Sequence, residues 1–122
     1  MLLVEYPTCT TCKRAKKYLL DQGVDFVARD IKLDNPNITE LTKWYRHSGL
    51  ALKKFFNTSG QVYRNENIKD KLTTMTEDEQ IALLASNGML VKRPILVVDD
   101  VVLVGFKEDV WHETLVQHGY IK

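Results

Sequence analysis

The chain has only two cysteines, Cys9 and Cys12, and both lie in the stretch YPTCTTCKRAKKYLL. Where a helix begins at such a CxxC pair, its unpaired backbone N–H groups and its dipole stabilise a thiolate on the first cysteine. The spacing therefore predicts that Cys9 is an attacking thiol. Cys12 falls one turn later, at the edge of the apolar helix face, and is predicted to be a less exposed, resolving thiol.

A run of cations follows the second cysteine directly: Lys13, Arg14, Lys16 and Lys17. Positive charge near a thiol favours its ionised form, and it can also hold an oxyanion or an acidic thiol substrate near the sulfur. Lys13 is the candidate for such a local role. Arg14 and Lys17 are assigned to a solvated helix face.

Two other uses of the cysteines compete with redox chemistry. Structural zinc takes four ligands, whereas the chain has no second CxxC pair and its histidines, His47, His112 and His118, are scattered. No metal site is therefore expected. Two inert cysteines in a hydrophobic core stay open as an alternative, because free cysteine is often simply buried.

The composition is that of an ordinary globular protein, with 122 residues, 44% hydrophobic and 27% charged residues and a net charge of +1. This length fits one domain, and the charge balance gives no reason to expect direct nucleic-acid or membrane binding. The N-terminal MLLVEYPT lacks the features of an export signal. We therefore expect a cytoplasmic protein, in a compartment that keeps thiols reduced.

The elements that must position the thiols can be read from the first third of the chain. MLLVE is typical of a short buried strand, Tyr6-Pro7-Thr8 of a turn, and the following apolar spacing of a helix that ends at Gly23. Residues 24–32 are predicted to form a second strand, parallel to the first because a helix connects them.

Capping patterns and a hairpin mark the rest of the chain. Asn37 with Glu40, and Thr76 with Glu79, predict two further helix starts. PILVVDDVVLVGF predicts a hairpin, followed by a final helix at about 108–118. This order predicts an α/β protein, a single thioredoxin-like domain over residues 1–122 with a mixed central sheet.

Two further segments bear on the site. In VKRPIL, Pro94 can simply mark a strand edge, but in a thioredoxin-type domain this strand begins beside the thiol loop, often at a cis proline. That placement would bring Arg93 within reach of an anion at Cys9. In LALKKFFNTSG the two phenylalanines are predicted to be core, and Lys53 or Lys54 is a candidate to face the thiol pocket.

YPTCTTCKRAKKYL, LKKFFNTSG and KRPILVV with VLVGFKED occur in this order over nearly the whole chain. Together they resemble the ArsC/Spx family, which contains glutaredoxin-linked arsenate reductases and Spx transcriptional regulators. The resemblance implies a thioredoxin-like fold with an inserted helical subdomain, at approximately 37–92. It also implies that Cys9 attacks arsenate, and that glutathione and glutaredoxin resolve the adduct without any bound cofactor.

The resemblance also implies which side chains hold the anion. Three arginines surround it in the reductases: Arg93 matches the second, Lys53 stands at the first, and Phe106 stands at about the third, where Lys107 could partly substitute. Lysine lacks the planar fork that binds an oxyanion through two hydrogen bonds. The catalytic residues are predicted to be Cys9, Cys12 and Arg93. Those predicted to bind the substrate or its anion are Thr8, Thr10, Thr11, Lys13, Lys53 and Pro94.

The Spx side of the resemblance gives an alternative function. It implies a redox-sensing regulator that binds the C-terminal domain of the RNA polymerase α subunit, with a disulfide between Cys9 and Cys12 as its switch. The expected substrate is otherwise a small oxyanion or a thiol or disulfide, and glutaredoxin is an expected partner. A third alternative is a family member whose anion site serves another glutathione-linked substrate.

Overall fold

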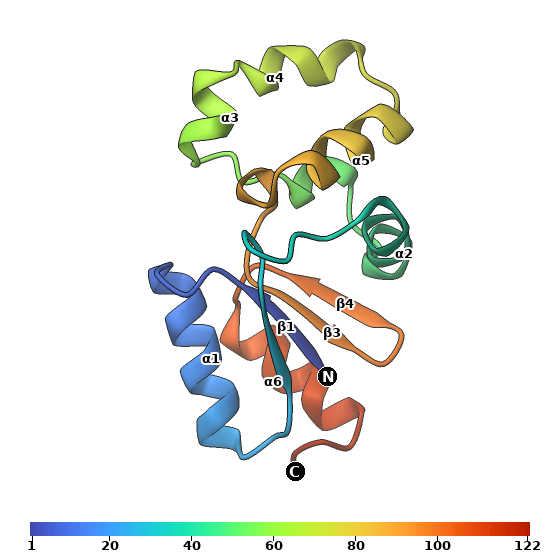
Figure 1. The fold of residues 1–122 in the computed structure, drawn as a ribbon. Coiled ribbons are helices and arrows are strands. Elements are labelled where there is room, and N and C mark those ends of the chain that lie inside the picture. Colours follow the sequence, from blue (N-terminus) through green and yellow to red (C-terminus); the bar gives the residue numbers. More distant parts are fainter.

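A four-stranded mixed sheet forms the centre of the computed structural model, which describes residues 1–122. Its strands are β1 (Leu2–Glu5), β2 (Val27–Asp30), β3 (Ile95–Val98) and β4 (Val101–Val104), in the order β2-β1-β3-β4. β1 runs parallel to β2 and antiparallel to β3, and β3 pairs antiparallel with β4 (Figure 1). The predicted α/β thioredoxin-like architecture with a mixed sheet is confirmed.

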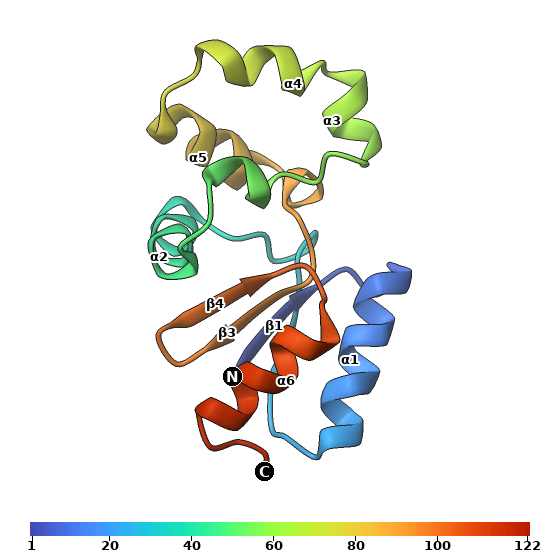
Figure 2. The ribbon, with the colours of Figure 1, turned by 180° about the vertical axis from the view of Figure 1, so that it is seen from behind.

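Two helices cover one face of this sheet, α1 (Thr10–Gln22) and α6 (Glu108–Gln117), as seen from behind in Figure 2. Gly23 ends α1 in the left-handed conformation, at φ 71°, as its position in the sequence predicted. Leu3 and Leu96 project from the strands into this layer, where they join Leu19 and Trp111 in a buried core.

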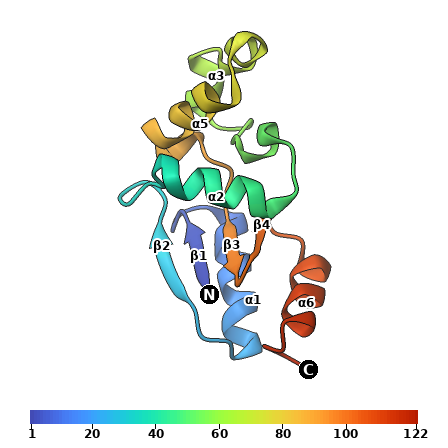
Figure 3. The ribbon, with the colours of Figure 1, turned by 90° about the vertical axis from the view of Figure 1, so that its right-hand side faces the viewer.

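α2 (Ile38–Ser48) packs on the opposite face of the sheet (Figure 3). It begins with the predicted capping box, in which the Asn37 side chain accepts from the Glu40 N–H and the Glu40 carboxylate accepts from the Asn37 N–H. Leu41 and Trp44 are buried in a second core, together with strand residues such as Ile95. Alternate residues of one strand thus serve two cores.

The remaining helices form a lobe beyond one end of the sheet (Figure 1). They are η1 (Leu52–Phe55), α3 (Gln61–Asn65), α4 (Ile68–Lys71), η2 (Leu72–Thr74), α5 (Glu77–Ser86) and η3 (Gly88–Leu90). The Thr76–Glu79 capping box starts α5, as predicted. All of these helices, and α2 before them, lie between β2 and β3 in the sequence.

The entry to this lobe is hydrogen-bonded to its exit. Phe56 and Val91 form an isolated antiparallel bridge. On either side of it the Asn57 N–H donates to the Leu90 carbonyl at 2.8 Å, and the Lys92 N–H donates to the Phe55 carbonyl at 2.7 Å. The segment carrying Lys53 and Lys54 is thereby held next to the segment that leads into Arg93.

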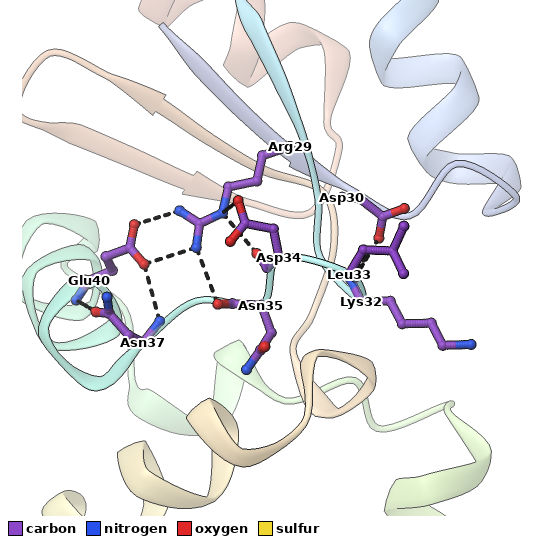
Figure 4. A network of polar contacts seen from close by, with 8 residues as sticks. All are labelled: Arg29, Asp30, Lys32, Leu33, Asp34, Asn35, Asn37 and Glu40. Atoms are coloured by element: carbon purple, nitrogen blue, oxygen red, sulfur yellow. Dashed lines mark hydrogen bonds and ion pairs between the residues drawn. The ribbon is translucent and has the colours of Figure 1, made fainter.

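A polar network fastens β2 to the start of α2 (Figure 4). The Arg29 guanidinium donates to both carboxylate oxygens of Glu40, at 2.5 and 2.9 Å, and to the main-chain carbonyls of Asp34 and Asn35. Glu40 simultaneously caps α2 through the Asn37 N–H. One arginine therefore links the sheet, the loop after β2 and the helix cap.

The second strand is shorter than residues 24–32, the range predicted from the sequence. Val24 and Phe26 pack against the core beneath α1 and α6 before the strand begins. The strand lies at the edge of the sheet, with β1 as its only partner, and its first residue Val27 is 67% exposed.

None of the helices has the length and apolar character needed to cross a membrane.

Candidate functional site

Cys9 occupies the N-cap position of α1, where the chain turns out of β1. The turn is closed by the Cys9 N–H, which donates to the Tyr6 carbonyl at 2.9 Å, and the Cys9 carbonyl accepts the first helical bond, from Lys13. No side chain caps this helix with a hydrogen bond. The first N–H groups of α1 therefore remain available to a negative charge at the cysteine sulfur.

The electrostatic surroundings favour the thiolate of Cys9. Burial acts to raise its pKa, but hydrogen bonds from the Cys12 backbone and thiol, from the Arg93 guanidinium and from the Thr11 backbone outweigh that effect and lower the pKa below its ordinary value. Cys9 is partly exposed. It is thus both accessible and activated, the two properties that a nucleophilic cysteine requires.

Cys12 has the opposite character. It is fully buried, and this burial, together with the neighbouring Cys9 sulfur, raises the pKa of its thiol to about 12. The two cysteines are both free and approach to 3.4 Å. The predicted difference in exposure between the two thiols is confirmed.

Arg93 reaches the thiol loop from the start of β3, next to a cis peptide bond between Arg93 and Pro94. Its guanidinium lies 5.0 Å from the centre of the Tyr6 ring, so the turn before Cys9 positions it. Its Nη1 atom is buried and has no hydrogen-bond partner. A buried, unpaired donor of this kind is costly, and an anion bound beside Cys9 would satisfy it.

A groove of about 740 Å³ opens beside these residues. Cys9 does not line the groove itself, but its neighbours Thr11 and Arg93 do. Cations make up six of the thirteen lining residues, and none of the thirteen is acidic. The six cations are Arg14, Lys53, Lys54, Lys92, Arg93 and Lys107. A protein with a net charge of only +1 thus gathers positive charge next to its activated thiol.

Four of the six residues predicted to bind the substrate or its anion lie away from this groove. Thr8 and Thr10 are exposed on the turn and first position of α1, and Pro94 is buried. Lys13 lines a different groove, with Lys16, on the far side of α1. Thr11 and Lys53 do line the cationic groove.

The groove also contains residues that the sequence did not single out. Arg14, which was assigned to a solvated face, lines it instead of Lys13. Lys92, which immediately precedes Arg93, also lines it and is not among the predicted site residues. The spacing of Thr11 and Arg14, three residues apart and hence on one helix face, was the available signal.

No three His, Cys, Asp or Glu side chains come together in a cluster suited to a metal ion. The structure therefore offers the site a thiol pair and cations as its reactive and binding groups. A thiol with a lowered pKa at the start of the first helix, beside a strand that is preceded by a cis proline, defines a protein of the thioredoxin-like class.

The ArsC family model matches residues 4–114, and the chain belongs to this family. The protein YusI of Bacillus subtilis (strain 168) is 52% identical over 108 residues, which cover 88% of this chain and 92% of YusI. The family assignment agrees with the resemblance drawn from the sequence motifs.

Solved structures of related proteins share the fold. An ArsC-family-related protein from Bacteroides fragilis is 53% identical, with a TM-score of 0.89 over 92% of this chain and 94% of that one. A protein from Streptococcus mutans UA159, described as a possible arsenate reductase, is 48% identical, with a TM-score of 0.82 over 89% and 95% of the two chains.

Regulators are also among the relatives. The regulatory protein MgsR of Bacillus subtilis (strain 168) is 28% identical over 83% of this chain and 79% of its own. The global transcriptional regulator Spx of the same organism is 25% identical over 84% and 77%. The family therefore spans proteins named as reductases and proteins named as regulators.

Proposed function

We propose that the protein is a thiol-dependent oxidoreductase that acts on an oxyanion such as arsenate, with Cys9 as its nucleophile. The observation that carries this proposal is the pairing of an activated Cys9 with Arg93, whose buried Nη1 lacks a partner at the edge of a cationic groove. Similarity to a Streptococcus mutans protein described as a possible arsenate reductase supports it.

The proposed reaction begins when the Cys9 thiolate forms a bond to the arsenic of arsenate and an arsenic-bound oxygen leaves, protonated, as water. A second thiol then attacks the Cys9 sulfur, and the sulfur–arsenic bond breaks with its electron pair going to arsenic. Arsenic is thereby reduced from the pentavalent to the trivalent state, and a disulfide forms on Cys9. Arg93 stabilises the charge on the oxyanion oxygens throughout.

The second thiol comes either from Cys12 or from glutathione. Cys12 is close enough to Cys9 to form an internal disulfide after modest movement, but its raised pKa makes it a poor nucleophile until its proton is removed. We propose glutathione and glutaredoxin as the external reductants that restore the thiols.

The test is arsenate-dependent NADPH oxidation, coupled through glutathione, glutaredoxin and glutathione reductase. We expect Cys9→Ser to abolish turnover and Arg93→Ala to lower it by about 100-fold, the typical effect of removing one preorganised donor from an oxyanion site. Arg46→Ala, on the exposed side of α2, is the charge control. Turnover that survives in Cys9→Ser would refute the proposal, and the Cys12→Ser rate identifies the resolving thiol.

A second candidate function is a redox-sensing regulator, favoured by the similarity to Spx and MgsR and by the proximity of two free thiols. In it, a disulfide between Cys9 and Cys12 controls binding to the C-terminal domain of the RNA polymerase α subunit. Binding should then differ between the reduced and oxidised protein, and Cys12→Ser should remove that difference. Lack of binding in both thiol states rules this function out.

A further inference from the structure

Arg14 stands where two surface grooves meet. It lines the cationic groove beside Cys9 and also a second groove of about 670 Å³ between α1 and α6. Phe106 is the only other residue that lines both grooves. Arg14 and Phe106 therefore lie at the boundary between the two grooves. Their backbone elements are adjacent, because α1 passes the segment leading from β4 into α6 (Figure 2).

The Phe106 ring gives Arg14 a fixed support. The Arg14 Cζ atom lies 5.9 Å from the centre of this ring, within the range of a cation–π contact. Phe106 is itself held by Tyr18, at 5.8 Å between ring centres, and by buried Trp111, at 4.8 Å and 82°. An exposed arginine is thereby given a preferred position by an aromatic cluster rather than by an ion pair.

Arg14 forms no ion pair, although Asp21, Glu108 and Asp109 line the second groove with it. No carboxylate lies within ion-pair distance of its guanidinium, although Lys17 one turn later is paired with Asp21 at 2.6 Å. Thr11, one turn before Arg14 on the same face, directs its backbone N–H toward Cys9. Thr11, Arg14 and Arg93 all line the cationic groove, so the charge of Arg14 lies on the groove shared by two residues that donate to the Cys9 sulfur.

We propose that Arg14 is a specificity-determining residue of the anion site, which holds the substrate oxyanion opposite Arg93 while Lys53 closes a third side. This inference rests on the proposed function and assigns the anion-binding role to a residue of α1. The three cations come from three parts of the chain: Arg14 from α1, Lys53 from η1 and Arg93 from the segment before β3. A planar guanidinium can donate two parallel hydrogen bonds to an oxyanion, which a lysine cannot do.

The experiment measures how well inorganic sulfate and arsenate protect Cys9 from alkylation by iodoacetamide at fixed pH and ionic strength, with Cys9 followed by peptide mass spectrometry. The half-protecting concentration reports anion affinity without requiring turnover. We expect Arg14→Gln to raise it about tenfold, the factor that one charge-assisted hydrogen bond is worth. Arg14→Lys should recover only part of the loss, and Phe106→Leu should weaken protection less than Arg14→Gln does.

Lys17→Gln is the matched control, because it removes the same charge from the same helix but lies outside the cationic groove. It should leave the half-protecting concentration unchanged. The role of Arg14 is refuted if the anions protect Cys9 in Arg14→Gln as well as they do in the wild type. If protection is lost in Arg93→Gln at the same time, the anion site itself stands. If neither anion protects the wild type, the oxyanion function and this inference fail together.

Discussion

At the level of single residues, the two thiols ionise in opposite ways although they lie 3.4 Å apart. The Cys9 sulfur accepts hydrogen bonds from backbone N–H groups and from the Arg93 guanidinium, whereas Cys12 is fully buried next to the Cys9 sulfur. The same helix start thus creates one thiol that is a thiolate at lower pH and one that keeps its proton. This asymmetry gives an order to the chemistry, because only one of the two sulfurs is ready to attack.

The pH dependence of alkylation tests this asymmetry. Because the pKa of Cys9 is lowered, its reaction with iodoacetamide should persist as the pH falls below the range of an ordinary cysteine, and Cys12 should stay unmodified in the folded protein. Arg93→Gln removes a donor to the thiolate and should shift the alkylation profile to higher pH. Arg46→Gln should not shift it. An unchanged profile in Arg93→Gln would show that the guanidinium does not act on the sulfur.

The sequence predicted the thiols of the site better than its cations. Cys9, Cys12 and Arg93 are marked by local motifs, a CxxC pair and a basic residue before proline. Lys13 was preferred to Arg14 because sequence order places it nearer to Cys12, whereas the rotation of α1 against the sheet places Arg14 toward the groove. The spacing of Thr11 and Arg14 indicates that they share a helix face, but the direction in which that face turns depends on packing between α1 and α6.

At the level of elements, the loop between β2 and α2 connects the sheet to the helices beyond it. Its capping box was predictable because Asn37 and Glu40 lie three residues apart. The role of Arg29 was not, since its partners come together only when β2 and α2 are in place. Arg29 also lies 6.0 Å from the Trp44 ring, so it packs on the helix as well as pairing with its cap.

Breaking the Arg29–Glu40 pair should destabilise the protein. Arg29 is only 15% exposed, and Arg29→Lys retains its charge but loses the two-pronged contact, so we expect a loss of about 2 kcal/mol in the free energy of unfolding. Lys17→Ala removes a far more exposed pair with Asp21 and should cost less than about 0.5 kcal/mol. Urea unfolding measures both. Equal losses in the two variants would contradict this account.

The same pair predicts how stability responds to acid. The hydrogen bond from Arg29 lowers the pKa of Glu40 in the folded protein below its value in the unfolded chain. Its stabilising contribution is therefore fully present above the unfolded pKa, about 4.3, and is lost as the pH falls through the lower folded pKa. Glu40→Gln should reduce the acid-induced loss of stability in urea unfolding measured between pH 6 and pH 3. If Glu40→Gln shows the same dependence of unfolding free energy on pH as the wild type, Glu40 is not the source of the acid-induced loss of stability.

Gly88 marks a close approach between two elements. A Cβ atom at this position would lie 1.8 Å from the Ile31 carbonyl oxygen, which is backbone and cannot move alone. Gly88→Ala should therefore cost about 3 kcal/mol or more in the free energy of unfolding. Gly60→Ala is the comparison, since its Cβ first meets the Asn57 side chain, at 2.7 Å. The midpoint temperature of thermal unfolding should be much lower for Gly88→Ala than for Gly60→Ala. The reverse order would contradict the close approach of Gly88 to the Ile31 carbonyl.

At the level of the whole molecule, two hydrophobic cores share one thin sheet. Trp111 is buried between α1, α6 and the sheet, and Trp44 is buried on the opposite side. Adjacent residues of β3 point into different cores, with Ile95 in one and Leu96 in the other. If β3 left the sheet, apolar side chains of both cores would therefore become exposed to solvent.

Unfolding should therefore be a single cooperative transition despite the two layers. Because the protein has two tryptophans, Trp44→Phe leaves a fluorescent probe of one core and Trp111→Phe leaves a probe of the other. For each variant, the urea midpoint from fluorescence should coincide with that from circular dichroism. Separate transitions for the two probes would show that the helical side unfolds independently of the side that holds α1 and the thiols.

The bridge between Phe56 and Val91 has one more consequence, for how this fold can vary. The chain leaves and re-enters the body of the protein at adjacent points, so residues 58–89 form a segment whose two ends are held together by hydrogen bonds. Lys53, Lys54 and Arg93 all lie outside this segment. Loops whose ends are already joined tolerate changes in length at little entropic cost. Insertions or deletions at the exposed connections between α3, α4 and α5 can therefore accumulate while the spacing of cations around the thiol is preserved.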